Sequence, residues 1–284
     1  MVYIGSHTSI AGGLENAAIE ASALGATAFG MFTKNQRQWA SKPITEEQSA
    51  TFRQTLKDLG YTKEQVLPHD SYLINLGNPD DLKRKQSLDA FIDELRRVHT
   101  LGLDKLNFHP GSHVNKIDRK GSLELVSEAL DEALRSTEGV HPIIETTAGQ
   151  GSNLGSSFEE IAQLLEMSSF PDRLGVCIDT CHIFAAGYDL RSEDSFYQTF
   201  EAFGRIVGFD KLAGMHLNDA KIALGSRLDR HENLGKGQIG VEPFIRIVQD
   251  ARFRGIPLIL ETIDSSLWAQ EIALLTNHAN KRKP

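Results

Sequence analysis

Residues 142–182, PIIETTAGQGSNLGSSFEEIAQLLEMSSFPDRLGVCIDTCH, contain the unit from which the fold can be predicted. The short apolar runs 142–145 and 175–178 are typical of buried strands, and the stretch between them has the pattern of an amphipathic helix. Ser157 and Glu160 have the spacing of a capping box at the start of that helix. A strand, a helix and a second strand in this order predict a parallel βαβ unit.

The same alternation extends over the rest of the chain. We expect eight strands, at residues 3–5, 26–32, 65–68, 105–108, 142–145, 175–178, 212–217 and 258–262. Helical periodicity lies between them, and Thr45 with Gln48 forms a second predicted capping box. Eight strands favour closure into a barrel over an open doubly wound sheet. The prediction is therefore an α/β protein with a single domain over residues 1–284, a (β/α)8 TIM barrel with its active site at the carboxyl ends of the strands.

The composition suits a soluble domain of this size, with 40% hydrophobic and 24% charged residues. The apolar runs are too short to span a bilayer, and the first residues lack the features of a secretory signal. The two cysteines, Cys177 and Cys181, do not make a disulfide framework, and we expect them to pack in the interior. These observations predict a cytoplasmic protein that does not interact with membranes. We expect the basic tail at about 280–284 to be frayed.

The net charge of −8 by itself argues against a nucleic-acid partner, because proteins that bind phosphate usually carry a basic surface. Net charge ignores bound metal ions, however. Three divalent ions would bring the total to about −2 and make their cleft locally positive. Composition alone therefore leaves the partner open.

Metal-binding side chains recur where the predicted strands end. The nine residues are His69, His109, Glu145, Asp179, His182, His216, Asp229, His231 and Glu261. The carboxyl ends of barrel strands meet on one face, where barrel enzymes carry their chemistry. A single histidine at such a position is more often a hydrogen-bonded structural residue, but nine unpaired polar groups would be costly to desolvate. The pattern predicts a metal site.

Nine ligands are too many for one ion, so two or three ions that share a bridging carboxylate fit the number better. Imidazoles with carboxylates suit zinc, with manganese or iron as alternatives. Asp229 and His231 lie in the long polar segment 218–240, which we expect to have no regular structure of its own. Together with His182 they could hold one ion separately from the rest.

Closely spaced divalent ions serve phosphoryl chemistry, because they activate water and neutralise charge on the transferred group. A phosphoester hydrolase is therefore the leading class of enzyme.

Several motifs resemble those of the endonuclease IV family, the apurinic/apyrimidinic endonucleases of base-excision repair. They are FTKNQRQW (32–39), LPHDSY (67–72), NFHPGS (107–112), IDTCH (178–182), MHLND (215–219), DRHENLG (229–235) and LET (260–262). The resemblance covers about residues 3–275, and it is specific because the motifs occur together.

The resemblance implies a barrel with three zinc ions. Carried over by motif, the first ion would be held by His69, His109 and Glu145, the second by Glu145, Asp179, His216 and Glu261, and the third by His182, Asp229 and His231. It also implies hydrolysis of the phosphodiester 5′ to an abasic site, which leaves a 3′-hydroxyl and a 5′-deoxyribose phosphate, and removal of groups that block 3′ ends. We expect Glu145 and Glu261 to be the catalytic carboxylates, with a hydroxide held between ions. Thr146 departs from the asparagine of relatives, which could alter the orientation of Glu145 slightly.

The implied partner is double-stranded DNA with abasic sites or blocked 3′ ends, bound by a monomer. The resemblance assigns DNA contacts to Arg37, Gln38, Tyr72 and Leu73. An abasic nucleotide lacks stacking and is easily extruded, and an inserted aromatic or apolar side chain can replace the lost stacking. Each of these residues could instead pack on its own barrel. Two further interpretations are weaker: that 235–237 (GKG) contacts phosphate, and that His7 supports the site without being a ligand.

The alternative is a sugar isomerase or epimerase of the xylose-isomerase-like barrel class, which holds one divalent ion. Glu145, Asp179, His216 and Glu261 match the ligands of such a site. The other five predicted ligands would have no role in it. They therefore distinguish the two interpretations.

Overall fold

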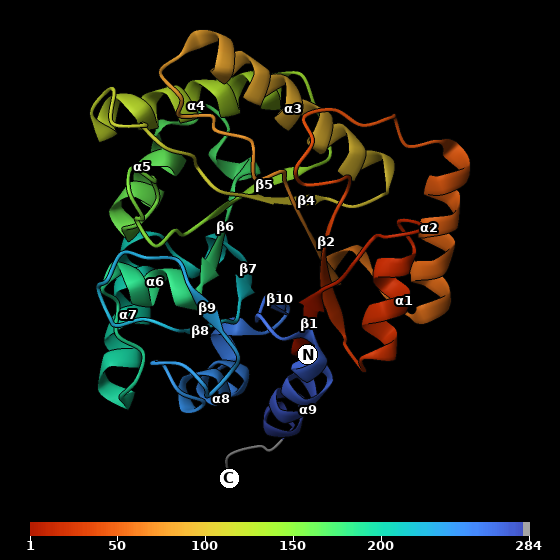
Figure 1. The fold of residues 1–284 in the computed structure, drawn as a ribbon, viewed down its shortest axis with the longest axis vertical. Coiled ribbons are helices and arrows are strands. Elements are labelled where there is room, and N and C mark those ends of the chain that lie inside the picture. Colours follow the sequence, from red (N-terminus) through yellow and green to blue (C-terminus); the bar gives the residue numbers. More distant parts are fainter. Residues whose placement is uncertain (281–284) are drawn as a thin grey trace.

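In the computed structural model, which describes residues 1–280, eight parallel strands close into a barrel (Figure 1). Around the barrel they follow the order β1-β10-β7-β6-β5-β4-β3-β2. The strands are β1 (Tyr3–His7), β2 (Ala28–Phe32), β3 (Val66–His69), β4 (Lys105–Phe108), β5 (His141–Glu145), β6 (Gly175–Asp179), β7 (Leu212–His216) and β10 (Pro257–Leu260). The predicted barrel is confirmed, with strand ends shifted by one or two residues. Residues 281–284, which make up most of the tail predicted to be frayed, lie outside the described part.

Helices surround the barrel on its outside (Figure 1). They are α1 (Asn16–Ala23), α2 (Glu46–Leu59), α3 (Asp81–Thr100), α4 (Arg119–Arg135), α5 (Phe158–Met167), α6 (Thr180–Ala186), α7 (Glu193–Ile206), α8 (Glu242–Gln249) and α9 (Trp268–Ala279). Short 3-10 turns at Lys63–Gln65, Pro171–Arg173, Phe209–Lys211 and Ala251–Phe253 lead into strands, and one at Ser265–Leu267 leads into α9. Within residues 1–280, every helix is too short or too polar to span a membrane.

The interior of the barrel is filled by a small apolar layer. Its members are Ala28, Leu67, Ile143, Cys177 and Ile259, all at most 1% exposed. A larger apolar cluster lies between the strands and the helices. Because this apolar layer closes the barrel below the rim, the polar side chains at the strand ends have buried apolar side chains beneath them. Cys177 is part of this apolar layer, which confirms the prediction that it packs in the interior.

The two predicted capping boxes have different outcomes. Thr45 and Gln48 form the reciprocal pair of bonds at the start of α2. Ser157 accepts a hydrogen bond from the Glu160 amide, but the carboxylate of Glu160 does not return to the cap. It instead accepts bonds from Arg119 and from the Gly155 amide, both at 2.8 Å. The second box was therefore only half right, because a charged arginine competes for the carboxylate.

The prediction of no regular structure in residues 218–240 was wrong. The segment contains a short antiparallel pair, β8 (Asp219–Ala220) and β9 (His231–Glu232). Two-residue strands are too short for a pattern of alternating residues to reveal them. The pair lies beside α6 at the rim of the barrel (Figure 1).

Gly5 is required for the close approach of β1 and β2. It pairs with Ala28, and a Cβ atom added to Gly5 would lie 1.6 Å from the Ala28 carbonyl oxygen. We expect Gly5→Ala to lower the free energy of unfolding by about 3 kcal/mol, measured by urea denaturation. Gly25→Ala is the control, because its φ of +75° is strained but no atom lies within 4 Å of the added Cβ. It should cost only about 1 kcal/mol, and equal losses would contradict the steric explanation.

Candidate metal centre

The strand ends bring all nine predicted metal-binding side chains to one rim of the barrel. Three of them, His69, Glu145 and His216, are the last residues of β3, β5 and β7. Asp179 ends β6, and His182 lies one turn further on, in α6. His109 and Glu261 directly follow β4 and β10, whereas Asp229 and His231 come from the segment after β7. A single site thus collects residues spread over 193 positions of the chain, from 69 to 261.

These side chains form three groups, in each of which the candidate ligand atoms lie within 4.8 Å of one another. The groups are His69, His109 and Glu145; Glu145, Asp179, His216 and Glu261; and His182, Asp229 and His231. They coincide with the three ligand sets that the family resemblance implied. Glu145 belongs to two of the groups, as a bridging ligand would.

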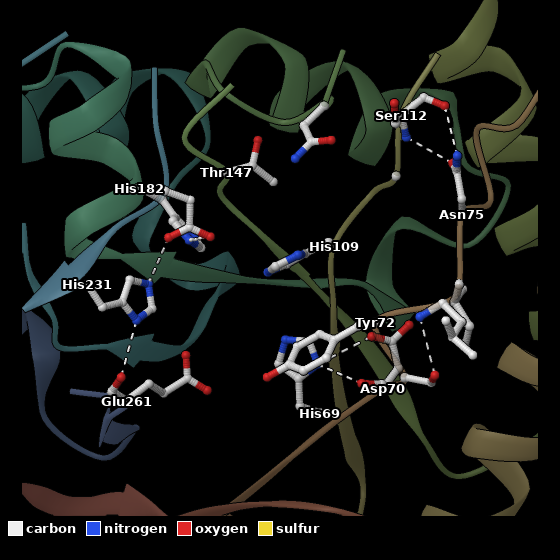
Figure 2. Close-up of a pocket in the computed structure, with 16 residues that line it drawn as sticks. His69, Asp70, Tyr72, Asn75, His109, Ser112, Thr147, His182, His231 and Glu261 are labelled. Carbon is white, nitrogen blue, oxygen red and sulfur yellow. Dashed lines mark hydrogen bonds and ion pairs between the residues drawn. The ribbon is translucent and has the colours of Figure 1, made fainter. Parts of the chain in front are cut away.

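Glu145 is the centre of the arrangement. Its Oε2 lies 3.3 Å from His69 Nε2 and 3.4 Å from His109 Nε2. Its Oε1 lies 3.1 Å from His216 Nδ1 and 3.3 Å from His182 Nδ1. The carboxylate is only 1% exposed, so both of its oxygens are committed to this cluster. Figure 2 shows His109 between His69 and His182, with the side chains converging on one cavity.

Backbone carbonyls fix the direction of three of the imidazoles. Nδ1 of His69 donates to the Asp70 carbonyl at 3.0 Å, and Nδ1 of His182 donates to the Thr146 carbonyl at 2.8 Å. Nδ1 of His231 donates to the Glu261 carbonyl at 3.2 Å (Figure 2). A carbonyl can only accept, so the neutral ring carries its proton on Nδ1 and turns the lone pair of Nε2 toward the cluster.

Two asparagines with no role assigned from the sequence support the carboxylates. Asn218 donates to Asp179 Oδ2 at 2.7 Å and accepts a bond from the Glu261 amide at 2.9 Å. Asn107 donates to Glu145 Oε2. Asn107 is a fully buried polar residue in a strand that is otherwise apolar at its buried positions. A polar side chain inside such a run could have indicated this role.

His7 and Thr146 also contact the ligands. Nδ1 of His7 lies 2.9 Å from Glu261 Oε1, in keeping with a supporting role. The Thr146 hydroxyl accepts a bond from the Asp179 amide at 3.0 Å, while its carbonyl accepts from His182. Thr146, for which the resemblance implied a departure from the family pattern, therefore connects ligands of two different groups, although it lies beside Glu145 in sequence.

Charge pairing within the cluster alters its ionisation. Burial raises the pKa of Glu145, but the surrounding His216 and His109 outweigh it and hold the pKa well below its usual range. Burial likewise opposes ionisation of Asp229, yet the hydrogen bond from His182 and the charges of His182 and His231 lower its pKa to about 2. Burial lowers the pKa of His216, but Glu145 and Glu261 reverse the effect and raise it to about 9.

The residues present fit divalent metal ions. Among the described residues, buried Nε2 of His231 has no hydrogen-bond partner. It faces Asp229 Oδ1 at 3.3 Å and Asp179 Oδ2 at 3.6 Å. A buried nitrogen without a partner is costly, and a metal ion would use its lone pair. Imidazole and carboxylate donors in this mixture suit zinc, manganese or iron.

Cys181 is also near the ligands, since its sulfur lies within reach of Asp179 and His231. The thiol donates to the Arg230 carbonyl at 3.5 Å, and burial raises its pKa to about 12. A thiol that stays protonated is a poor ligand. This agrees with the expectation that Cys181 packs.

The residues expected to contact DNA lie on two loops beside the site. Tyr72 (Figure 2) and Leu73 line a cavity of about 480 Å³ that opens above the cluster. Tyr72 is 61% exposed. Arg37 and Gln38 are exposed on the loop after β2 and lie outside the cavity lining. The hydroxyl of Ser71 donates to the Gln36 carbonyl at 2.8 Å and thereby joins the two loops.

A buried ionic cluster fixes the loop after β2 at its base. Lys34 is 1% exposed in its side chain and lies 3.3 Å from Glu94 and 3.2 Å from Asp93 of α3. The Thr33 hydroxyl donates to the same Glu94 carboxylate at 2.5 Å. The base of the loop is therefore rigid, while its tip with Arg37 is open to solvent.

The weak expectation that 235–237 contacts phosphate finds no support from the backbone amides of its two glycines. The amides of Gly235 and Gly237 donate to Asp219 Oδ2, at 2.9 and 3.0 Å. An internal carboxylate thus occupies the donors that a phosphate would need.

Comparison with known proteins agrees with this geometry. Residues 19–278 match the family described as xylose isomerase-like TIM barrel, which defines the class of the chain. A probable endonuclease 4 of Campylobacter curvus is 52% identical over 283 residues, which covers 100% of both chains. The crystal structure of endonuclease IV from Thermus thermophilus superposes with a TM-score of 0.85 at 33% identity, over 97% of this chain and 98% of that one. The chain belongs to the endonuclease IV family.

A sugar epimerase has the same fold. The D-psicose 3-epimerase from Clostridium cellulolyticum superposes with a TM-score of 0.71 at 16% identity, over 98% of both chains. At this identity the likeness shows a shared barrel and nothing about the reaction. The sequence alternative, a sugar isomerase or epimerase, therefore gains support only for its fold.

The raised pKa of His216 makes the stability of the metal-free chain depend on pH. The pKa of His216 has its usual value of 6.5 in the unfolded chain and is about 9 in the folded chain. Its stabilising effect is fully present below pH 6.5 and is lost as the pH rises through 9. We expect the urea midpoint of the EDTA-treated protein to fall between about pH 6.5 and pH 9.5, and to fall less in His216→Gln. A midpoint that rises over this range would contradict the assignment.

Proposed function

We propose that this protein hydrolyses the phosphodiester 5′ to an abasic site in double-stranded DNA, leaving a 3′-hydroxyl and a 5′-deoxyribose phosphate, and that it also trims blocked 3′ ends. Membership of the endonuclease IV family makes it a metal-dependent hydrolase of DNA repair. The observation that carries the finer proposal is the division of nine buried or half-buried ligands into three groups that share Glu145. Such closely spaced groups suit phosphoryl transfer.

Three ions, zinc with manganese or iron as substitutes, would be held by the three groups. When bound, they supply a nucleophile at neutral pH and neutralise the charge of the phosphate. We assign Glu145 and Glu261 as the catalytic carboxylates, because they belong to the same ligand group and both contact His216 Nδ1, at 3.1 and 3.2 Å. His7 holds Glu261 in place through its other oxygen. The lowered pKa of each carboxyl keeps both in the ionised form that metal binding needs.

The cavity supports a substrate extruded from the duplex. Its volume of about 480 Å³ can take a sugar and its phosphate, and it is lined on one side by the cluster and on the other by Tyr72 and Leu73. Arg37 and Gln38 extend from the adjoining loop, which Ser71 ties to the same rim. We assign to these four residues the role of filling the gap that the extruded nucleotide leaves. Because one barrel supplies every ligand, a monomer suffices, and we include a monomeric, cytoplasmic enzyme in the proposal.

The test is incision of a duplex that carries one abasic-site analogue, with an intact duplex of the same sequence as control. We expect incision only at the lesion, and about three ions per chain by elemental analysis. Glu261→Gln should lower the rate of incision at least about 100-fold, because it removes a charged ligand from the shared site. Circular dichroism should show an unchanged fold.

The other outcomes are equally specific. A protein with one bound ion that leaves the abasic duplex intact and epimerises a ketose would support the sugar-epimerase alternative. Incision at wild-type rate by Glu261→Gln with a full metal complement would remove Glu261 from the reaction. Incision of the intact duplex at the same rate would exclude lesion recognition.

A separate prediction concerns Tyr72. Its ring is exposed but held edge-on against Phe32, with centroids 5.3 Å apart. We expect Tyr72→Ala to weaken binding to abasic duplex about tenfold, because loss of a stacked base contact costs about 1–3 kcal/mol, and to weaken binding to intact duplex less. Fluorescence anisotropy measures both affinities. Tyr197→Ala, another exposed tyrosine that is distant in the chain and lies on α7, is the matched control. Equal losses on both duplexes would make Tyr72 an ordinary loop residue.

A further inference from the structure

Asp219 is a buried carboxylate whose partners are backbone amides. The side chain is fully buried, and no basic side chain within residues 1–280 forms an ion pair with it. Its Oδ1 accepts bonds from the amides of Ala220 at 2.8 Å and Ile239 at 2.9 Å. Its Oδ2 accepts bonds from Gly235, Gly237 and Gly240, at 2.9, 3.0 and 3.3 Å. A single carboxylate thus accepts hydrogen bonds from most of the amides of the turn 235–240 and from the Ala220 amide.

The turn is built to close around this carboxylate. A Cβ atom added to Gly237 would lie 2.4 Å from the Ala220 carbonyl oxygen and 2.5 Å from Asp219 Oδ1. The amide of Gln238 donates to that same Ala220 carbonyl at 2.7 Å. Residues 235–240 therefore fold back onto β8, and glycine is needed where the backbone touches the side chain.

The closed turn sets the register of β8 and β9. Asp219 pairs with Glu232 and Ala220 pairs with His231. The amide of Lys221 donates to the Arg230 carbonyl at 2.9 Å, which continues the pairing toward Asp229. The positions of Asp229 and His231 thus depend on a segment whose two ends meet at the Asp219 carboxylate, in addition to the bonds from the Asp229 amide to Gln150 Oε1 and from His231 Nδ1 to the Glu261 carbonyl.

The other candidate ligands do not share this dependence. His69, Glu145, Asp179 and His216 end barrel strands, and His109 and Glu261 follow strands directly. His182, the third member of the outer group, is fixed by α6 and by the Thr146 carbonyl. Of the nine, only Asp229 and His231 are placed by the segment between β7 and α8.

We propose that Asp219 is a positioning residue for the third metal group, which holds Asp229 and His231 in place through the backbone of residues 219–240. The inference rests on the proposed function for the existence of the third ion. It does not make Asp219 a ligand, because both of its carboxylate oxygens already accept hydrogen bonds from the amides of Ala220 and of the turn 235–240. Loss of its charge should release one ion selectively and leave the two that depend on strand ends.

The test compares Asp219→Asn with Asp131→Asn in the full-length protein. Asp131 is a matched control, because it is a buried carboxylate that accepts bonds from the Ser168 hydroxyl at 2.8 Å and the Ser169 amide at 2.9 Å, where α5 leads toward β6. Zinc content after dialysis and zinc titration give the number and affinity of the ions. Hydrogen exchange of the metal-free proteins reports on the amides of residues 229–240.

We expect Asp219→Asn to keep two ions and to bind the third about 10–100-fold more weakly. Excess zinc should restore most of the incision rate, and the amides of residues 229–240 should exchange faster than in the wild type. Asp131→Asn should lose stability but keep three ions. Three ions at wild-type affinity in Asp219→Asn, or unchanged exchange in its metal-free form, would overturn the inference and leave the proposed function intact.

Failure of the proposed function would look different. A wild-type protein that binds fewer than three ions would contradict the proposed metal complement and the metal part of this inference together. The exchange of residues 229–240 would still decide whether Asp219 orders the segment, because that measurement is made without metal. An equal loss of all ions in both variants would show that global destabilisation explains the effect, and would also overturn the inference.

Discussion

The site depends on one buried carboxylate, Glu145, around which four imidazoles of the candidate ligands are arranged. Glu145 accepts hydrogen bonds from Asn107 and His216, lies 3.3–3.4 Å from three further imidazoles, and has almost no access to water. In a dry interior, an arrangement of this kind is stable only if charge is balanced closely. The apolar layer below leaves any charge imbalance without solvent screening, and the hydrogen bond from Asn107 to Glu145 offsets only part of it. Divalent cations at the positions that the histidines define would relieve it.

The barrel explains why so many charged groups can be placed together without unfolding the chain. Six of the eight strands deliver one candidate ligand at or directly after their carboxyl ends, and the neighbouring strands hold those ends in register by backbone bonds. The electrostatic cost of placing these charged groups together is therefore opposed by the backbone hydrogen bonds of the closed barrel as well as by side-chain packing. This is also why the same barrel serves proteins of different chemistry, including epimerases that superpose on it with low identity.

Much of this arrangement could be predicted from the sequence, because the strand runs are apolar and the ligands stand directly after them. The run 142–145 that ends in glutamate is one example, and 175–178 followed by Asp179 is another. What could not be predicted depends on contacts between distant segments. Glu160 is drawn from its cap by Arg119, Asn218 connects Asp179 with the Glu261 amide, and the β8–β9 pair is too short to have a periodicity. Family resemblance supplied the division of ligands into groups, which the spacing alone left open.

The Asp219 turn also bears on how the number of ligand groups in such sites can change during evolution. Six candidate ligands end or directly follow barrel strands and His182 lies in α6, whereas the remaining two are carried by the segment between β7 and α8. Substitution or shortening of that segment would alter the number of ligand groups without disturbing a single barrel strand. The metal centre therefore has two parts. The ligands at the strand ends belong to the barrel itself, whereas Asp229 and His231 belong to one chain segment that can change independently of the barrel.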